Sequence, residues 1–202
     1  GSNEILQCIL LAYSGAGRNV TMFAPTYQMH AQIARVVGAK VVEGGRNADF
    51  TLDASEIERV VAQSNPAVSF ICSPNNPTGI ALPDGAIEAL ATARPNAIVF
   101  VDEAYADYAG RSFIPALRAN PSRFANVIVG RTFSKAHGLA GLRIGALIAP
   151  PDRLAGIEAM TSPFNVNIAA AAAVEAALTD ASWLRSTVDE ARACKDDVYE
   201  FC

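Results

Sequence analysis

Runs of five or six residues that are rich in apolar side chains alternate with longer amphipathic stretches along most of the chain. The runs indicate buried strands at residues 20–24, 39–43, 67–72, 97–101, 126–130 and 144–149. Between them, apolar side chains recur at the spacing of one helix face, at residues 5–13, 28–37, 54–61, 84–91, 112–120 and 151–160. This alternation predicts an α/β fold, a three-layer α/β/α sandwich around a mostly parallel sheet.

The C-terminal part of the chain departs from this alternation. Residues 169–178 are alanine-rich and apolar nearly all round, so we expect a helix that is buried at a domain or subunit interface. A charged helix follows from residue 181, and its pattern continues to the last residue without a glycine or proline to end it. We therefore expect residues 1–180 to form the large domain of a longer protein, and residues 181–202 to begin a helix that leads into a smaller domain.

Composition narrows the classes of function. The 202 residues are 51% hydrophobic with a formal net charge of −4, so the chain can bury a core, and its 16 Lys and Arg residues form no basic stripe for nucleic acid. No apolar run approaches the ~20 residues of a membrane span, and the N-terminus has no signal-peptide pattern. The four cysteines and two histidines lack metal-site spacing. These patterns predict a cytoplasmic protein with reduced thiols and with no metal, nucleic-acid or membrane partner.

A lysine in an unusual place lies between the last two apolar runs. Lys135 falls in a turn between two expected strands, with Thr132 and Ser134 before it and Arg143 after it. In such a pocket an amine can form an imine while hydroxyl groups and a guanidinium hold an anion, which is the chemistry of pyridoxal 5'-phosphate. A polar surface turn with a solvated lysine is the alternative.

The residues around Lys135 resemble a known motif. Ser134-Lys135, with Gly-Leu-Ala-Gly-Leu-Arg-Ile-Gly beginning three residues after the lysine, is similar to the cofactor-lysine motif of fold-type I pyridoxal-phosphate aminotransferases. The similarity is greatest to the histidinol-phosphate aminotransferase branch. The resemblance implies that Lys135 is the catalytic residue and binds the cofactor covalently. It also implies that Thr132, Ser134 and Arg143 anchor the cofactor phosphate together with the N-terminus of the first helix.

Two stretches nearer the N-terminus carry further parts of the resemblance. Ser2 and Asn3 could form a plain helix N-cap or belong to a cloning remnant, but they match the family's Gly-(Ala/Ser)-(Asp/Asn)-Glu turn at the cofactor phosphate. Tyr27, in Ala-Pro-Thr-Tyr, follows an expected strand, where an aromatic side chain more often fills a core. By resemblance, Tyr27 stacks on the pyridine ring of the cofactor.

Two strand ends complete the candidate site. Asn76 lies in Asn-Pro-Thr-Gly after a buried strand, and by resemblance it donates a hydrogen bond to the cofactor's phenolate oxygen. Asp102 ends the next strand, at the edge where α/β sheets place ligands, with a helix N-cap as its alternative role. The resemblance assigns Asp102 to the pyridine nitrogen and Tyr105 to the phenolate oxygen. Glu103 and Asp107 are interpreted as flanking surface charge.

The reaction also follows from the resemblance, which implies transamination of histidinol phosphate and 2-oxoglutarate to imidazole acetol phosphate and glutamate by a homodimer. More generally, the substrates would be an amino acid or amino phosphate and a 2-oxo acid. An aromatic-amino-acid aminotransferase and a threonine-phosphate decarboxylase stay open, since His137 stands where histidinol-phosphate enzymes commonly have an aromatic residue. A cofactor-binding sensor domain of a transcription regulator and a purely structural α/β module are alternatives of other classes.

Overall fold

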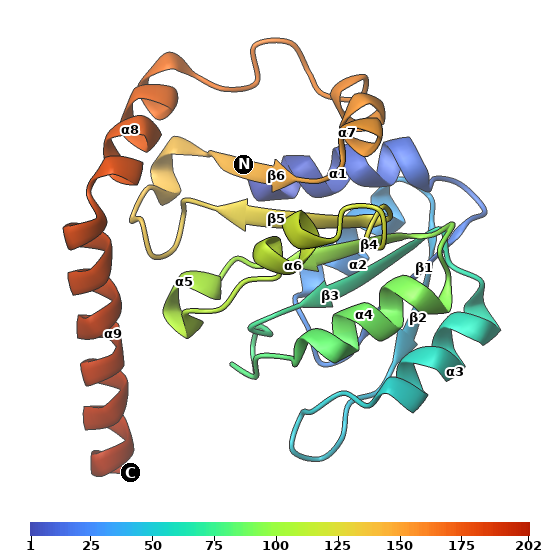
Figure 1. Ribbon diagram of the computed structural model, residues 1–202, viewed down its shortest axis with the longest axis horizontal. Coiled ribbons are helices and arrows are strands. Elements are labelled where there is room, and N and C mark those ends of the chain that lie inside the picture. Colours follow the sequence, from blue (N-terminus) through green and yellow to red (C-terminus); the bar gives the residue numbers. More distant parts are fainter.

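A single sheet forms the centre of the chain (Figure 1). The computed structural model describes residues 1–202 apart from the side chain of residue 84. In the described residues the strands are β1 (Asn19–Phe23), β2 (Lys40–Gly44), β3 (Val68–Cys72), β4 (Ile98–Asp102), β5 (Val127–Thr132) and β6 (Gly145–Ile148). Their order is β2-β1-β3-β4-β5-β6, and all pairs are parallel except the antiparallel pair of β5 and β6. The predicted mostly parallel sheet is confirmed.

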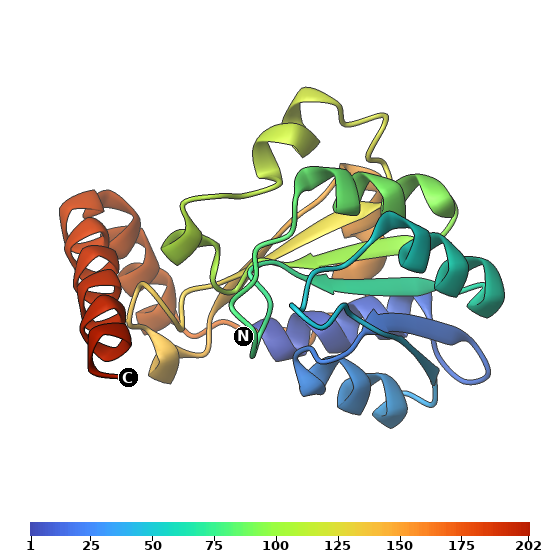
Figure 2. The same cartoon turned by 90° about the horizontal axis from the view of Figure 1, so that it is seen from below.

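Helices cover both faces of the sheet (Figure 1, Figure 2). On one face lie α1 (Ser2–Tyr13), α2 (Gln28–Val36) and α7 (Pro151–Glu158), and on the other lie α3 (Ala54–Ser64), α4 (Asp84–Ala93) and α6 (Ile114–Ala119). Side chains of each strand alternate between the faces, so that along β4 Phe100 packs with the first group and Val99 and Val101 with the second. The two hydrophobic cores that result give the predicted α/β/α sandwich.

The alanine-rich helix α8 (Ile168–Thr179) extends away from the sheet (Figure 1). In the described chain only Ala170 of this helix is buried, so the chain itself does not cover the helix, and its burial at a domain or subunit interface stays a prediction. Its main neighbour is the next helix, α9 (Ala181–Phe201), which covers little of its surface. No helix in the described residues is long and apolar enough to cross a membrane.

Helix α9 (Ala181–Phe201) contacts the sheet domain at two places, through Trp183 and through Arg192. A Cβ on Gly138 would come within 3.2 Å of the Trp183 indole, so the indole lies directly against this glycine. The Arg192 guanidinium donates a hydrogen bond to the Tyr108 carbonyl oxygen at 3.0 Å. The role of residues 181–202 as the lead into a second domain stays a prediction.

Gly130 lies where β5 passes the ring of Phe100 on β4. A Cβ at residue 130 would lie 2.3 Å from Phe100 Cζ, and the ring is only 1% exposed, so it can move only by displacing its neighbours. We expect Gly130→Ala to lower the free energy of unfolding by about 1–3 kcal/mol, the usual cost of overpacking a core. Denaturant unfolding followed by circular dichroism measures the difference.

Gly85→Ala is the matched control for this substitution. A Cβ on Gly85 would meet no atom within 4 Å, and the residue lies in the first turn of α4. Alanine stabilises a helix by up to about 1 kcal/mol relative to glycine, so this variant should keep or raise the free energy of unfolding. Equal stability of Gly130→Ala and the wild type would contradict the close packing of β4 and β5.

Candidate active site

The motif residues meet at one edge of the sheet. Strands β1, β3, β4 and β5 run parallel, so their carboxyl ends lie at the same edge, and the register aligns Asp102 with Cys72 on one side and Gly130 on the other. Predicted site residues follow these strands, namely Tyr27 after β1, Asn76 after β3, Asp102 and Tyr105 at the end of β4, and Ser134 and Lys135 after β5. This edge is where open α/β sheets bind ligands.

Asp102 is a buried carboxylate, 7% exposed, with two fixed contacts. Its Oδ2 lies 2.9 Å from Nε2 of His30, and its Oδ1 accepts a hydrogen bond from the Ala104 N–H at 3.0 Å. The side chain follows Phe100 on the face of β4 that α2 covers, which is why it meets a residue of α2. The helix after β4, α5 (Ala106–Ala109), has its N-cap at Tyr105, so the alternative role of Asp102 as an N-cap is wrong.

His30 was not singled out from the sequence. Its side chain is fully buried and stacks on Phe70, with ring centroids 4.8 Å apart and an interplanar angle of 15°. Its position on the buried face of α2 is typical of a core residue, and only the contact with Asp102, 72 residues away, gives it a role. The His30 ring holds the Asp102 carboxylate in one orientation at the edge of the sheet.

The buried thiol of Cys72 lies at the same edge of the sheet as Asp102. Cys72 lies beside Asp102 in the sheet, and burial, with the Asp102 charge adding to it, raises the pKa of the thiol well above its ordinary value. The thiol therefore stays protonated and unreactive. All four cysteines are free, and in the described part of the chain no group of three or more His, Cys, Asp or Glu side chains could hold a metal ion.

Lys135 and Tyr105 face each other across two neighbouring turns. The Lys135 Nζ lies 5.3 Å from the centre of the Tyr105 ring, and the lysine is exposed. The lysine turn is closed by the Gly138 N–H, which donates to the Lys135 carbonyl oxygen at 2.9 Å, with Gly138 at φ +68°, where glycine is favoured. Since Tyr105 follows Asp102 by three residues, the amine, the phenol ring and the buried carboxylate all lie at the carboxyl edge.

The two asparagines of the turn after β3 have different surroundings. Asn75 is 2% exposed, and its side-chain amide is fully used. Its partners are Thr26 Oγ1, Arg46 Nη2, Pro25 O and Thr78 Oγ1. The Asn76 side chain has no hydrogen-bond partner among the described residues, and with Tyr105 it lines a hollow of ≈ 420 Å³. Asn75 therefore holds the turn in place, and Asn76 is available to a ligand.

The N-terminus of α1 lies against β6. The helix begins at Ser2 with Gly1 as its N-cap, so the predicted N-cap at Ser2 or Asn3 is wrong. The Ser2 and Asn3 N–H groups instead lie in the first turn, where backbone donors have no partner within the helix. A Cβ on Gly145 would come within 3.2 Å of the Ser2 nitrogen, so glycine is what allows this approach. Free N–H groups and the helix dipole suit an anion here.

The other predicted phosphate ligands lie around this N-terminus. Thr132 pairs with Gly145 between β5 and β6, and its Oγ1 accepts a hydrogen bond from the Ser134 N–H at 3.2 Å. The Arg143 guanidinium reaches the N-cap, since a Cβ on Gly1 would lie 3.1 Å from its Nη2. The Arg143 charge, the Thr132 hydroxyl and the free backbone donors of α1 therefore lie in one region, an arrangement that suits a phosphate.

Tyr27 connects the anion end of the site to the buried carboxylate. Its hydroxyl donates a hydrogen bond to Asn3 Oδ1 at 3.4 Å. Its ring meets His30 edge-on, with centroids 5.4 Å apart and an interplanar angle of 89°. Tyr27 therefore lies between the N-terminus of α1 and the His30–Asp102 pair.

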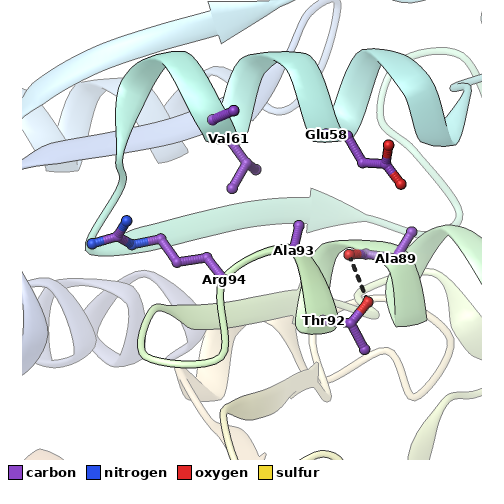
Figure 3. Close-up of a pocket in the computed structure, with 7 residues that line it drawn as sticks. Glu58, Val61, Ala89, Thr92, Ala93 and Arg94 are labelled. Carbon is purple, nitrogen blue, oxygen red and sulfur yellow. Dashed lines mark hydrogen bonds between the residues drawn. The ribbon is translucent and has the colours of Figure 1, made fainter.

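A separate hollow lies between α3 and α4 (Figure 3). Its volume is ≈ 430 Å³, and it is lined by Glu58, Val61, Ala62, Ala89, Thr92, Ala93 and Arg94. The Thr92 hydroxyl is already bonded to the Ala89 carbonyl oxygen at 3.2 Å, and no predicted site residue lines the hollow. The candidate site is therefore the carboxyl edge of the sheet and not this hollow.

Comparison with known proteins tests the resemblance carried by the motifs. The family described as Aminotransferase class I and II matches residues 1–199. The chain belongs to this aminotransferase family. The resemblance proposed from the residues around Lys135 is confirmed at the level of the family, whereas the roles of individual residues stay predictions.

This aminotransferase-family chain is similar to curated proteins named histidinol-phosphate aminotransferase. The protein of Streptomyces avermitilis is 39% identical over 200 residues, covering 97% of this chain and 53% of the relative, and that of Thermobifida fusca is 41% identical over 201 residues, covering 100% and 54%. The chain thus spans about half the length of the curated relatives it matches.

A solved structure supports the same fold. The crystal structure of histidinol-phosphate aminotransferase from Sinorhizobium meliloti, in complex with pyridoxal-5'-phosphate, superimposes with a TM-score of 0.85 at 28% sequence identity. The match covers 93% of this chain and 51% of that one. The predicted fold class is therefore confirmed by a protein of known structure as well as by the sheet topology.

Proposed function

We propose that this chain carries the cofactor-binding part of a pyridoxal-phosphate-dependent aminotransferase. The proposed reaction converts histidinol phosphate and 2-oxoglutarate to imidazole acetol phosphate and glutamate. The observation that carries the proposal is the 39–41% identity, over nearly the whole chain, to curated proteins named for that activity. The relatives reported above are named as aminotransferases, so the alternative of a regulator's sensor domain gains no support.

The residues at the carboxyl edge fit pyridoxal 5'-phosphate in three parts. The N–H groups of Ser2 and Asn3, the Thr132 and Ser134 hydroxyls and the Arg143 guanidinium would hold the phosphate. The close approach of α1 to Gly145 leaves no room for a side chain and brings these donors together. Tyr27 would pack on the ring, and Lys135 would bind the cofactor covalently through Nζ.

The electronic tuning of the cofactor would come from the other end of the site. When bound, pyridoxal 5'-phosphate supplies a ring that accepts the electron pair left on the substrate's Cα. Asp102, oriented by His30, would hold a positive charge on the pyridine nitrogen. Asn76 and Tyr105 would donate hydrogen bonds to the phenolate oxygen. Lys135 Nζ would carry the proton that leaves the substrate's Cα.

The proposal includes the assembly and location implied by the family resemblance. We infer a homodimer in the cytoplasm, with an amino acid or amino phosphate and a 2-oxo acid as substrates. The four free cysteines support a reducing compartment. Residues 1–180 would form the cofactor-binding domain, and α9 would lead on from it.

A panel of amino donors tests the proposed substrate. The full-length protein, loaded with cofactor, is assayed with 2-oxoglutarate and histidinol phosphate, phenylalanine, tyrosine or threonine phosphate, and release of carbon dioxide is followed in parallel. We expect kcat/KM for histidinol phosphate to exceed that for phenylalanine by at least about 100-fold, because sites built to pair a polar group discriminate strongly against ligands that lack it. Faster turnover of phenylalanine, or release of carbon dioxide from threonine phosphate, would move the protein to one of the alternative activities.

A further inference from the structure

Arg131 joins two carboxylates that the candidate site does not use. It lies on β5, and strand alternation turns its side chain to the face opposite Thr132. Its Nη1 lies 3.1 Å from Oε2 of Glu103, and its Nη2 donates a hydrogen bond to Oδ1 of Asp107. One guanidinium is thus shared between Glu103, directly after β4, and Asp107 in α5.

The sequence suggested that Glu103 and Asp107 are flanking surface charge, but the structure shields both side chains. The Glu103 side chain is 2% exposed, and it also accepts hydrogen bonds from the Ser112 hydroxyl at 2.7 Å and from the Phe113 N–H. The Asp107 side chain is 15% exposed. Glu103 directly follows β4 and Asp107 lies in α5, and both side chains are largely shielded from solvent, so the sequence-based interpretation was wrong.

These contacts enclose the turn that carries Tyr105. Glu103 and Asp107 stand two residues before and two residues after Tyr105, and both are fixed to Arg131. Arg131 itself lies four residues before Lys135, on the segment that leads into the lysine turn. The Lys135 Nζ lies 5.3 Å from the centre of the Tyr105 ring. The two turns that carry these residues are therefore linked by the contacts of the Arg131 guanidinium.

His137 adds little charge to this contact. Its Nδ1 lies 4.0 Å from Asp107 Oδ2 and has no hydrogen-bond partner among the described residues. Burial, with the Arg131 charge adding to it, lowers the pKa of His137 against the opposing effect of Asp107, so the ring is neutral near pH 7. Arg131 is therefore the cation that compensates Asp107.

We propose that Arg131 is a positioning residue, which sets the placement of Tyr105 relative to Lys135 by bridging Glu103 and Asp107. The inference rests on the proposed function, because it gives these two residues their roles at the cofactor. Arginine is required for the bridge, since its planar guanidinium presents donors to two carboxylates at once and a lysine ammonium is a single point charge. Arg131→Lys keeps the charge and loses the bridge.

The test uses the full-length, cofactor-loaded protein and three variants, Arg131→Lys, Asp107→Asn and the double substitution. We expect each single variant to lose about 10- to 100-fold in kcat, because displacement of a reacting group by about 1 Å can cost that much, while KM changes by less than about threefold. The double variant should be no worse than Arg131→Lys, because both changes remove the same contact. Arg123→Lys, which alters one exposed ion pair with Glu88, is the control and should keep the wild-type kcat.

Hydrogen exchange tests the contacts of Arg131 with Glu103 and Asp107 without depending on catalysis. In the cofactor-free protein, hydrogen exchange of the Ala106 and Tyr108 amides, which bond to Glu103 O and Tyr105 O, should be faster in Arg131→Lys than in the wild type and in Arg123→Lys. Unchanged exchange overturns the inference. The inference is also overturned if the losses of kcat in the two single variants add up in the double variant. It is overturned as well if the activity of both single variants falls only in proportion to their content of folded protein.

The two proposals fail in different ways. An active wild type whose kcat is unaffected by Arg131→Lys would overturn the positioning role and leave the aminotransferase function standing. A wild type that binds no pyridoxal 5'-phosphate and transaminates no donor would overturn the function, whereas the exchange measurement would still report whether Arg131 fixes the Tyr105 turn.

Discussion

Lys135→Ala is expected to lower the rate of transamination by a factor of at least about 10⁴, because in the proposed function Lys135 is both the covalent anchor of the cofactor and the group that carries the proton. The Lys135 Nζ is exposed at the carboxyl edge beside Tyr105, and the rest of its turn is held by backbone hydrogen bonds. The variant should therefore fold and still bind the cofactor noncovalently through the phosphate ligands. Steady-state assays of the full-length protein measure the loss.

Borohydride reduction followed by peptide mass mapping identifies the anchoring residue directly. In the wild type we expect the cofactor on the peptide that contains Lys135, and in Lys135→Ala we expect none. Lys40→Ala is the matched control, since Lys40 is exposed at the start of β2, away from the carboxyl ends of the strands. Attachment to another lysine in the wild type would contradict the proposed site.

Asp102→Asn is expected to lower kcat by roughly 10²–10³, which is typical when one preorganised charged partner of the reacting group is removed. The amide has nearly the same shape as the carboxylate, but it carries no charge to stabilise a protonated pyridine nitrogen. The contact with His30 Nε2 at 2.9 Å can persist through the amide oxygen, so the fold should be kept.

Asp53→Asn provides the control for this prediction. Asp53 is exposed at the N-cap of α3, where no side-chain capping hydrogen bond is present among the described residues. We expect its kcat to match the wild type. If Asp102→Asn turned over within about threefold of the wild type, Asp102 would not be the partner of the pyridine nitrogen.

The strand ends could be predicted because β3, β4 and β5 contain short, mostly apolar and buried runs, each followed by a polar turn. A sheet buried on both faces requires such runs, and parallel strands bring their carboxyl ends together, so the sequence predicts Asn76, Asp102 and Lys135 at one edge. The structure places all three turns there. For these residues, local pattern and tertiary position agree.

Contacts between distant segments could not be predicted in this way. His30 has the spacing of a core residue on α2, and nothing in the local sequence relates it to Asp102. Glu103 and Asp107 lie in a polar segment of the sequence that is typical of an exposed turn. Both pair with Arg131, which lies on a neighbouring strand. For the apolar helix α8 the sequence predicts burial but does not state which partner covers it, and the chain itself leaves the helix largely exposed.

The packing of Trp183 on Gly138 has a practical consequence. This indole is the chain's single tryptophan, and it rests on the glycine three residues after Lys135. Its emission should therefore report on the lysine turn without an added label, and we expect binding of the cofactor to quench it.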